Sequence, residues 1–355
     1  MSKALAVYAG KTALAQIKEQ GISQEQFKLL VGASGGPKWF VLAGLDRFLC
    51  GEFFKSRQTP LYTLGSSAGA WRFSCYAQQD PLAAINRLID GYSHLTYPSD
   101  ASISEVTIQS EKLLAHIVSK NADEIASNPM IKSTLIVAKS KGLTRYENKY
   151  IQLLGLLSSA LANRVNRKHL GKYYQRTVFS TDITQIPFDY DDGIDSKVVA
   201  LTKHNIHQAL QATGSIPMVI NGVKDIEGAG VGMFRDGGII DYHFDQPFLP
   251  NAKDSGLVLY PHFYNEFKPG WFDKYIKHRF ANKKHFDKTL VLAPTDEFVA
   301  KLPYGKIPDR KDFTQLSASE RIKYWQTVIG ESERLAEEFA SLCQSDDLGK
   351  AITLI

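Results

Sequence analysis

The feature that most constrains the fold is an alternation of short apolar runs with longer segments of helical periodicity. Such runs, bounded by turn residues and rich in Val, Ile and Leu, are typical of strands buried on both faces of a sheet. The alternation therefore predicts an α/β fold with a mostly parallel central sheet between helices. The expected strands are residues 28–33, 61–65, 134–138, 177–181, 197–202, 256–260 and 289–293.

No Pro- or Ser-rich linker and no internal repeat divides the 355 residues, so the expectation is a single domain over 1–355 with a core at about 28–300. The pattern over about 100–170 is mostly helical. It predicts a helical insertion that forms either a cap over a site or a packed layer. A further helix is predicted over 317–342, with Ser317 or Ser319 as its N-cap.

Composition narrows the class of protein. The chain is 44% apolar or aromatic and 22% charged, as in ordinary globular domains. A net charge of +5 is too weak to indicate nucleic-acid binding, although it favours attraction to an anionic membrane surface. Cys50, Cys75 and Cys343 lack metal-like spacing and fit a reducing compartment. With no recognisable signal peptide or transmembrane stretch, we expect a cytoplasmic protein whose membrane contact, if any, is peripheral.

Residues 65–69, Gly-Ser-Ser-Ala-Gly, match the G-x-S-x-G pattern that often surrounds a nucleophilic serine. The motif follows the expected strand 61–65 and precedes a helical pattern. A strand, a sharp turn and a helix in this order present the central serine at the positive end of the helix. Ser67 is therefore the candidate nucleophile, and an ordinary strand-to-helix loop is the alternative.

A second glycine-rich turn precedes this motif. Backbone N–H groups at such a turn bind an anion, either a phosphate or the oxyanion of an acyl-transfer intermediate. A nucleotide-binding P-loop requires Ser or Thr after its lysine, whereas Trp39 follows Lys38 here. We therefore expect the N–H groups of Gly35 and Gly36 to form an oxyanion hole, with Lys38 and Trp39 as candidate substrate contacts. A purely structural turn is the alternative.

A third stretch, Asp236-Gly237-Gly238, lies between two apolar runs. It is either a hairpin turn or a carboxylate held at the end of a strand, where the glycines allow close approach to the serine turn.

In this order, the three stretches resemble the patatin-like phospholipase family. "ASGGPKW" is similar to that family's oxyanion stretch, "GSSAG" to its nucleophile elbow and "DGG" to its catalytic aspartate motif. "VFSTDITQ" and "HQALQATGSIPMVI" also resemble family segments, and the likeness spans roughly residues 28–300. The resemblance implies a three-layer patatin-like fold and a lipid acyl hydrolase of the phospholipase A or lysophospholipase type. It implies a Ser67–Asp236 dyad, an acyl-enzyme intermediate, and no metal or other cofactor.

The glycine loop departs from the family's usual D-G-G-G-x-[KR]-G pattern. Ala33, Ser34 and Trp39 stand where the family has the acid, the first glycine and the last glycine, whereas Gly35 and Gly36 are kept. These departures affect the expected substrate preference more than the expected chemistry.

A Ser-His-Asp triad is the alternative to the dyad, because His243 and His262 follow the D-G-G motif in the chain. Asp241 and Asp245 are fallback carboxylates. Arg235 is expected either to contact a headgroup or to be exposed.

Two basic stretches, 163–176 and 271–288, are candidate membrane contacts or solvated basic faces. In the second stretch, Tyr275, Phe280 and Phe286 alternate with Lys and Arg, a pattern that suits an anionic bilayer surface. Three functions stay open: hydrolysis of a lipid ester, hydrolysis of a soluble ester or thioester, and lipid binding without catalysis. The sequence leaves the oligomeric state open.

Overall fold

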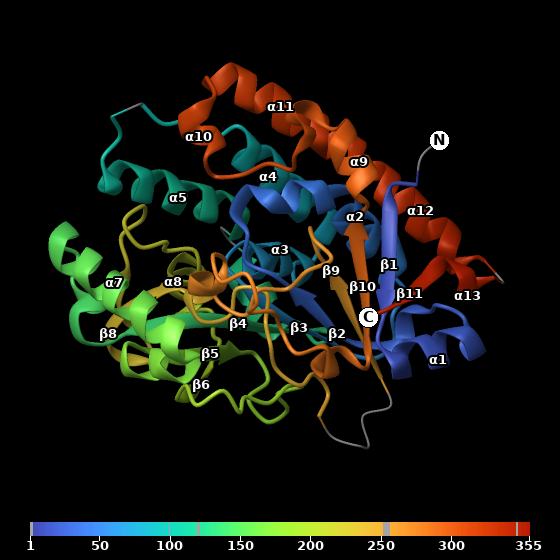
Figure 1. Cartoon of the computed structure of the whole chain (residues 1–355), viewed down its shortest axis with the longest axis horizontal. Helices are drawn as coiled ribbons and strands as arrows, with labels where there is room; N and C mark the ends of the chain where they lie inside the picture. The colour runs from blue at the N-terminus through green and yellow to red at the C-terminus, as the bar shows by residue number, and fades with distance from the viewer. Residues whose placement is uncertain (1–2, 99, 119–120, 251–255, 346) are drawn as a thin grey trace.

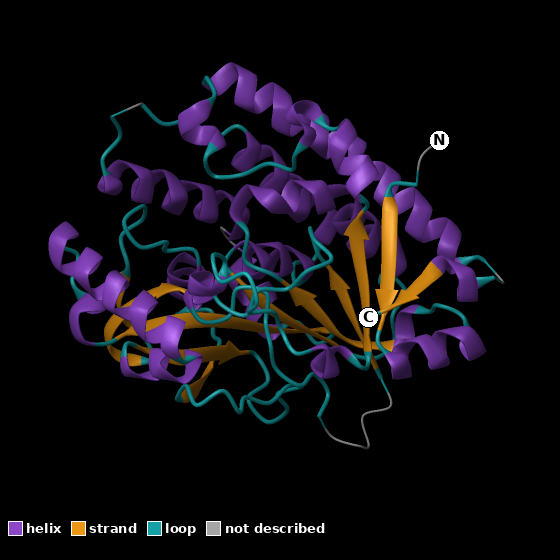
Figure 2. Cartoon of the chain, in the orientation of Figure 1, coloured by secondary structure: helices purple, strands orange, loops and turns teal. Residues whose placement is uncertain are grey.

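The computed structural model describes residues 3–98, 100–118, 121–250, 256–345 and 347–355. Within these ranges, eleven strands form one mostly parallel sheet in the order β11-β1-β10-β9-β2-β3-β4-β5-β6, and β8 pairs with both β4 and β7. Helices flank the sheet in a three-layer α/β arrangement (Figures 1 and 2). The strands are β1 (Leu5–Ala9), β2 (Phe27–Gly32), β3 (Leu61–Ser66), β4 (Ile131–Ser140), β5 (Tyr174–Ser180), β6 (Ser196–Ala200), β7 (Val223–Ile226), β8 (Gly230–Asp236), β9 (Leu257–Pro261), β10 (Thr289–Pro294) and β11 (Ile352–Leu354).

The meeting of two strands on one side of β4 decides where the candidate residues lie. The first part of β4 pairs parallel with β3, with Ser66 opposite Ile136. The second part pairs antiparallel with β8, with Asp236 opposite Val137. Because β5 occupies the other side of β4 over residues 134–140, β3 and β8 run toward each other along the same side. The residues at their ends are therefore brought together.

Two layers of helices cover the face of the sheet above the serine turn. α3 follows β3 directly and packs against α4, while α11 and α12 run along the outside of α2 and α4 (Figure 1). The helices are α1 (Lys11–Gln20), α2 (Ala43–Phe48), α3 (Ala68–Tyr76), α4 (Pro81–Ser93), α5 (Ile103–Val118), α6 (Ala122–Ser127), α7 (Lys149–Val165), α8 (Ile206–Thr213), α9 (Asp296–Lys301), α10 (Asp312–Gln315), α11 (Ala318–Glu331), α12 (Glu333–Cys343) and α13 (Leu348–Ala351).

A buried ion pair fixes α3 against α2. Arg72 Nε donates to Asp46 Oδ2 at 2.7 Å, and the Tyr76 hydroxyl donates to Asp46 Oδ1 at 2.8 Å. The two charged side chains are 1% and 0% exposed. Removing one partner of such a pair leaves an uncompensated buried charge, at a cost of about 3–5 kcal/mol. The pair therefore holds in place the helix that carries the serine turn.

The seven predicted strands correspond to β2, β3, β4, β5, β6, β9 and β10, which confirms the predicted α/β class. Every residue of β9 and β10 is buried, as expected of strands covered on both faces. The sequence did not predict β1, β7, β8 or β11. The residues of β8, GVGMFRD, include two glycines and two charged residues, a composition that does not indicate a strand.

Three predicted ranges require correction. The range 100–170 is not a helical insertion, because β4 lies inside it and pairs with β3, β5 and β8. The sheet also begins before residue 28, at β1. The helix predicted over 317–342 is divided at Ser332 into α11 and α12. Ser317 is confirmed as its N-cap, since its hydroxyl accepts a hydrogen bond from the N–H of Glu320 at 3.3 Å.

Candidate active site

Ser67 stands at a sharp turn between β3 and α3. Its backbone angles are φ 53° and ψ −123°, a conformation that non-glycine residues adopt only when the surrounding structure enforces it. Gly69 permits the turn, because a Cβ at this position would lie 1.9 Å from the carbonyl oxygen of Gly32. The predicted order of strand, sharp turn and helix is therefore present.

The side chains of Ser67 and Asp236 are in hydrogen-bond contact. Ser67 Oγ donates to Asp236 Oδ2 at 2.9 Å, and the N–H of Gly238 donates to Asp236 Oδ1 at 2.7 Å. Both side chains belong to residues that are only 7% exposed. A hydroxyl that donates to a carboxylate, itself oriented by a second donor, has the geometry required of a nucleophile and its base.

Burial raises the pKa of Asp236 to about 6, although hydrogen bonds from Gly238 and Ser67 and the positive charges of Arg310 and Lys274 oppose the shift. An unperturbed aspartate, with a pKa of about 3.9, is a weak base. A carboxylate with a pKa of about 6 is still mostly ionised at neutral pH and accepts a proton more readily.

The two histidines of the alternative triad are engaged elsewhere. His243 Nδ1 accepts a hydrogen bond from the N–H of Lys268 at 3.0 Å, and His262 Nδ1 lies 2.7 Å from the carbonyl oxygen and 3.0 Å from the N of Tyr264. The two rings pack edge to face, with centroids 4.4 Å apart. Burial lowers the pKa of both imidazoles, that of His262 to about 3. Both are therefore poor bases, and this geometry favours the dyad over the triad.

Ser34 ties the glycine loop to the serine turn. Its hydroxyl donates to Ser66 Oγ at 2.9 Å, and its N–H donates to the carbonyl oxygen of Tyr242 at 2.9 Å. Tyr242 lies shortly after the D-G-G motif in the chain. Ser34 thus joins the glycine loop to the serine turn and to the segment that follows the D-G-G motif.

Gly35 and Gly36 line the same cavity as Ser67. Gly36 has φ +55°, a conformation that favours glycine because other residues are strained there. In the described part of the chain, the N–H groups of Gly35 and Gly36 have no hydrogen-bond acceptor. They are therefore available to a bound ligand.

Thr213 is a site residue that the sequence did not predict. The N–H of Ser67 donates to Thr213 Oγ1 at 2.9 Å, and the Thr213 hydroxyl donates to the carbonyl oxygen of Ile136 at 2.6 Å. These two bonds connect the strained serine to β4 through the last residue of α8. The segment around Thr213 resembles a family segment, but no motif marks the threonine itself.

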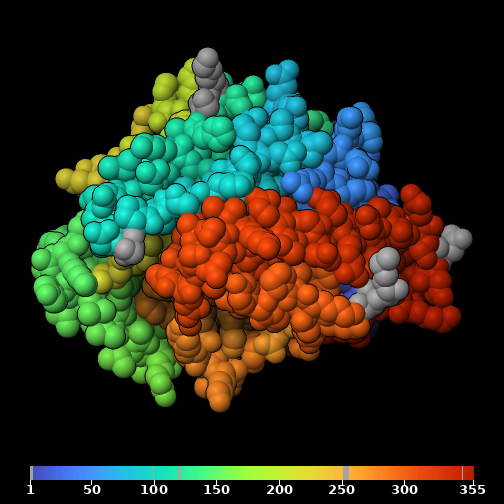
Figure 3. Space-filling view, turned by 90° about the horizontal axis from the view of Figure 1, so that it is seen from above, coloured from blue at the N-terminus to red at the C-terminus, as the bar shows by residue number. Residues whose placement is uncertain are grey.

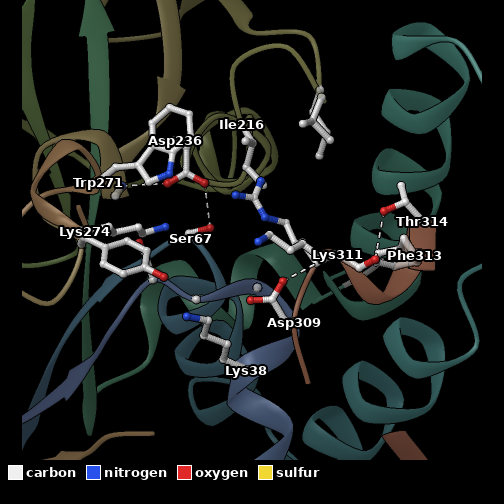
Figure 4. Close-up of a pocket in the computed structure, with 18 of the residues that line it drawn as sticks. Lys38, Ser67, Ile216, Asp236, Trp271, Lys274, Asp309, Lys311, Phe313 and Thr314 are labelled. Carbon is white, nitrogen blue, oxygen red and sulfur yellow. Dashed lines mark hydrogen bonds between the residues drawn. The ribbon is translucent and has the colours of Figure 1, made fainter. Parts of the chain in front are cut away.

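The serine and aspartate open into a cavity of about 1240 Å³. Ser67 and Asp236 lie between Lys274 on one side and Phe313 on the other (Figure 4). The cavity has an apolar wall from α5, the segment after α8, and the region of α10. The residues of this wall include Val106, Ile216, Pro217, Val219, Ile220, Phe313 and Leu316.

Two lysines of the cavity lie over aromatic rings. Lys38 Nζ is 4.9 Å from the ring centroid of Tyr264, and Lys274 Nζ is 3.8 Å from that of Tyr242. Burial, with the positive charges of Lys38 and Arg310, lowers the pKa of Lys274 to about 6. Burial also lowers the pKa of Lys38, but Tyr242 and Tyr264 outweigh it, and the net shift is upward. Lys274 belongs to the basic stretch 271–288, which the sequence left open as a membrane contact or a solvated face, and the sequence gave no signal for Arg310.

Trp39 does not line the cavity. It is 1% exposed and packs against Phe40, with ring centroids 4.8 Å apart. Trp39 is therefore a core residue, and the predicted substrate contact is corrected. Lys38, one position earlier in the same 3₁₀ helix (Gly36–Leu42), does line the cavity.

Arg235 is neither exposed nor part of the cavity, contrary to both sequence-based alternatives. It is 1% exposed and forms an ion pair with Glu147 at 2.8 Å. Adjacent residues of a strand point to opposite faces of the sheet, so Arg235 points away from the side on which Asp236 lies.

The fallback carboxylates have other partners. Asp241 accepts a hydrogen bond from Arg176 Nε at 2.7 Å, and Asp245 Oδ1 lies 2.8 Å from His285 Nδ1. Phe286, predicted at a membrane-facing surface, is 1% exposed and belongs to the core.

Within the described ranges, no group of three or more His, Cys, Asp or Glu side chains is arranged to hold a metal ion. Among the same residues, no helix combines the length and apolar character needed to cross a membrane.

No protein-family model matches the sequence, and no curated protein matches it. Among solved structures, the chain is similar to VipD from Legionella pneumophila, with a TM-score of 0.33 and 13% identity. The match covers 75% of this chain and 54% of that chain, so this chain spans about half the length of VipD in that structure. The case for a function therefore depends on the geometry of the site.

Proposed function

We propose that the protein is a serine hydrolase that cleaves fatty-acyl esters of lipids, with Ser67 as nucleophile and Asp236 as base. The observation that carries the proposal is the 2.9 Å hydrogen bond from Ser67 Oγ to Asp236 Oδ2 at a buried, strained turn. The cavity supports a lipid substrate, since about 1240 Å³ exceeds the roughly 300–1,000 Å³ of ordinary small-molecule sites. Its apolar wall suits an acyl chain.

In the proposed mechanism, Ser67 Oγ adds to the ester carbonyl carbon while its proton passes to Asp236 Oδ2. The tetrahedral intermediate collapses, the bond to the leaving oxygen breaks, and Asp236 returns the proton to the leaving alcohol. Water then adds to the acyl-enzyme and transfers a proton to Asp236. The bond to Ser67 Oγ breaks, the serine regains its proton, and the carboxylic acid leaves.

The N–H groups of Gly35 and Gly36 are proposed to stabilise the negative oxygen of each tetrahedral intermediate. Three features support this role: their place in the cavity lining, their lack of other acceptors among the described residues, and the bonds of Ser34 that join their loop to the serine turn. Donors that are fixed before the reaction stabilise developing charge without reorganisation. One such donor typically lowers the activation barrier by about 3–4 kcal/mol.

A fluorophosphonate probe tests the nucleophile. We expect covalent labelling of Ser67 in the parent protein, and loss of labelling together with at least about a thousandfold loss of ester turnover in Ser67→Ala. Ser127→Ala is the control, because it removes an exposed serine outside the cavity and should still be labelled. Absence of labelling in folded parent protein would favour the alternative of a lipid-binding protein without catalysis.

Hydrolysis of a soluble ester or thioester by the same dyad is the other alternative. Comparing a micellar phospholipid with a short-chain nitrophenyl ester separates the two. A preference for the soluble ester at equal enzyme concentration would contradict the lipid assignment and leave the serine chemistry intact.

We also propose that α7 contacts an anionic membrane surface. Five apolar residues on one side of this helix, Tyr150, Leu154, Leu157, Leu161 and Val165, are between 53% and 78% exposed. Their spacing of three and four residues forms one continuous stripe on the helix. In Figure 3, the green segment that contains α7 lies at the surface, beside a hollow bordered by the teal of α5 and the red of α10.

Two observations support a lipid surface as the occupant of this stripe. α7 adjoins the cavity rim, because Gln152 accepts a hydrogen bond from the N–H of Met218 at 2.9 Å and Asn163 Nδ2 donates to Asp273 at 2.7 Å. Exposed basic residues, Arg164, Lys168 and Lys172, follow the stripe. Other arginines of the basic stretch 163–176 do not contribute, since they form ion pairs with buried or partly buried aspartates.

Sedimentation with phosphatidylcholine vesicles, with and without phosphatidylglycerol, tests this contact. We expect stronger binding to the anionic vesicles, weakened by salt, and a loss of at least about tenfold in Leu157→Asn/Leu161→Asn. Leu354→Asn, a change at another leucine that is 56% exposed, is the matched control and should bind like the parent. Equal binding by the double variant and the parent would overturn the assignment of α7.

A further inference from the structure

The lining of the cavity carries more positive than negative side chains. Six basic residues, Lys38, Lys268, Lys274, Arg310, Lys311 and Arg321, line it with three acidic residues, Asp236, Glu266 and Asp309. One of the acids, Asp236, is already engaged with Ser67 and Gly238. The excess charge of the lining is unexplained by the ester chemistry alone, which needs only the serine, the aspartate and the N–H donors.

Lys38, Lys274 and Arg310 come together from three separate segments of the chain. Figure 4 shows the side chains of Lys38 and Lys274 pointing toward Ser67. The side chain of Arg310 lies beside the glycine loop, since its Cγ would be 3.4 Å from a Cβ at Gly36. The three basic side chains are thus distributed around the proposed reacting atoms. Lys274, with its pKa of about 6, is mostly neutral at pH 7 in the free protein, and a phosphate bound beside it would raise that pKa and favour its protonated form.

None of these three cations has a carboxylate within 4.0 Å in the described part of the chain. Asp309, which lines the same cavity, instead accepts a hydrogen bond from the N–H of Lys311 at 2.8 Å. Asp236 and Asp309 act on Lys274 from beyond 4.0 Å. Basic side chains without a carboxylate in direct contact are stabilised by an anion that enters with a ligand.

Two aromatic rings of the cavity, Tyr242 and Tyr264, are unsuited to a cationic headgroup. A quaternary ammonium binds over the faces of aromatic rings. Here Lys38 lies over Tyr264 and Lys274 over Tyr242, with Nζ 4.9 and 3.8 Å from the respective ring centroids. A ligand cation would meet the like charge of Lys38 at Tyr264, and the Lys274 side chain covers a face of Tyr242. These two rings therefore disfavour a choline-type headgroup.

We propose that Lys38, Lys274 and Arg310 form a binding site for a phosphate group of the substrate, and that the protein prefers net-anionic acyl esters over zwitterionic ones. This inference rests on the proposed function, because the ligand is described as its substrate, but binding of the ligand can be measured without catalysis. The substrate class is an acyl ester whose alcohol carries a phosphate without an attached cation. The acyl chain lies along the apolar wall, and the phosphate lies among the three cations.

Calorimetric titration of the Ser67→Ala protein tests the site. The ligands share one acyl chain and are used below their critical micelle concentrations: 1-acylglycerol 3-phosphate, 1-acylglycerol 3-phosphocholine and 1-acylglycerol. We expect the phosphate ester to bind about tenfold or more tightly than the phosphocholine ester, as one charge-assisted contact implies. Lys274→Met and Arg310→Gln, each in the Ser67→Ala background, should lower that ratio about tenfold.

The control variant is Lys323→Gln, which removes one positive charge from an exposed position of α11 outside the cavity and should keep the parent ratio. Titration with inorganic phosphate distinguishes two sources of the anion. Binding that is lost in Arg310→Gln means that the site accepts free phosphate, whereas binding of the acylated ligand alone means that the chain is also required.

Equal affinity for the three acylated ligands, or ratios unchanged in both cavity variants, would overturn the anion site. Failure of the proposed function is a different result: no fluorophosphonate labelling and no ester turnover by the parent protein. Since the titrations use a variant that lacks the nucleophile, either proposal can fail while the other stands.

Discussion

The pH dependence of ester hydrolysis tests Asp236 as the base, because burial raises the pKa of Asp236 to about 6 and lowers that of His262 to about 3. The base must be ionised to accept the serine proton. We therefore expect kcat/KM for a soluble short-chain ester to rise with pH through about 6 and to level off above it. At pH 5, about a tenth of the carboxyl groups with such a pKa are ionised, so kcat/KM should be about a tenth of its plateau value.

The rival bases give a different profile. An unperturbed aspartate, with a pKa of about 3.9, would give nearly full activity at pH 5. Burial places the pKa of His262 at about 3, which would do the same. An acid limb below pH 5, measured while circular dichroism shows the protein folded, would therefore refute Asp236 as the base.

A single substitution shifts the acid limb of the kcat/KM profile in a predictable direction. The positive charge of Arg310 opposes the upward shift that burial imposes on the pKa of Asp236. Arg310→Gln should therefore raise that pKa and shift the acid limb of kcat/KM to higher pH. Lys323→Gln, which removes a charge outside the cavity, should leave the limb in place. A limb that moves downward in Arg310→Gln would contradict the electrostatic account.

Three further predictions concern stability and positioning. Folding raises the pKa of Asp236 from 3.8 to about 6, so this group lowers the free energy of unfolding by up to about 3 kcal/mol as the pH rises through that window. The inactive variant Asp236→Asn should therefore have a higher melting temperature than the parent at pH 8 but not at pH 3. Gly69→Ala should fail to fold, or should lose several kcal/mol of unfolding free energy in a denaturant titration, since its Cβ would meet backbone at 1.9 Å. Gly330→Ala should instead stabilise α11 by about 0.5–1 kcal/mol, because no atom lies within 4 Å of an added Cβ. Thr213→Val removes the acceptor for the N–H of Ser67 and should lower kcat more than it raises KM; a change in KM alone would contradict its role in positioning the serine.

The residue pattern alone predicted much of the fold and singled out Ser67, whereas the role expected of Asp236 came from the resemblance of three ordered motifs. Seven strands were readable because burial on both faces produces continuous apolar runs, a property of each segment by itself. Ser67 was readable because a tight strand-to-helix turn needs small residues at fixed neighbouring positions. Asp236 was readable only as part of an ordered set of three motifs, since its own strand β8 has a composition that hides it.

Tertiary structure alone decided which residues share the cavity. Ser67 and Asp236 are 169 residues apart, and their 2.9 Å contact exists because β3 and β8 end against each other on one side of β4. Lys274 and Arg310 enter from irregular segments without any periodicity, and Trp39 turns into the core although its neighbour lines the cavity. Local sequence sets the backbone preference of each segment and the spacing of its buried residues. Strand pairing and packing set the distances between segments, and no short-range pattern contains that information.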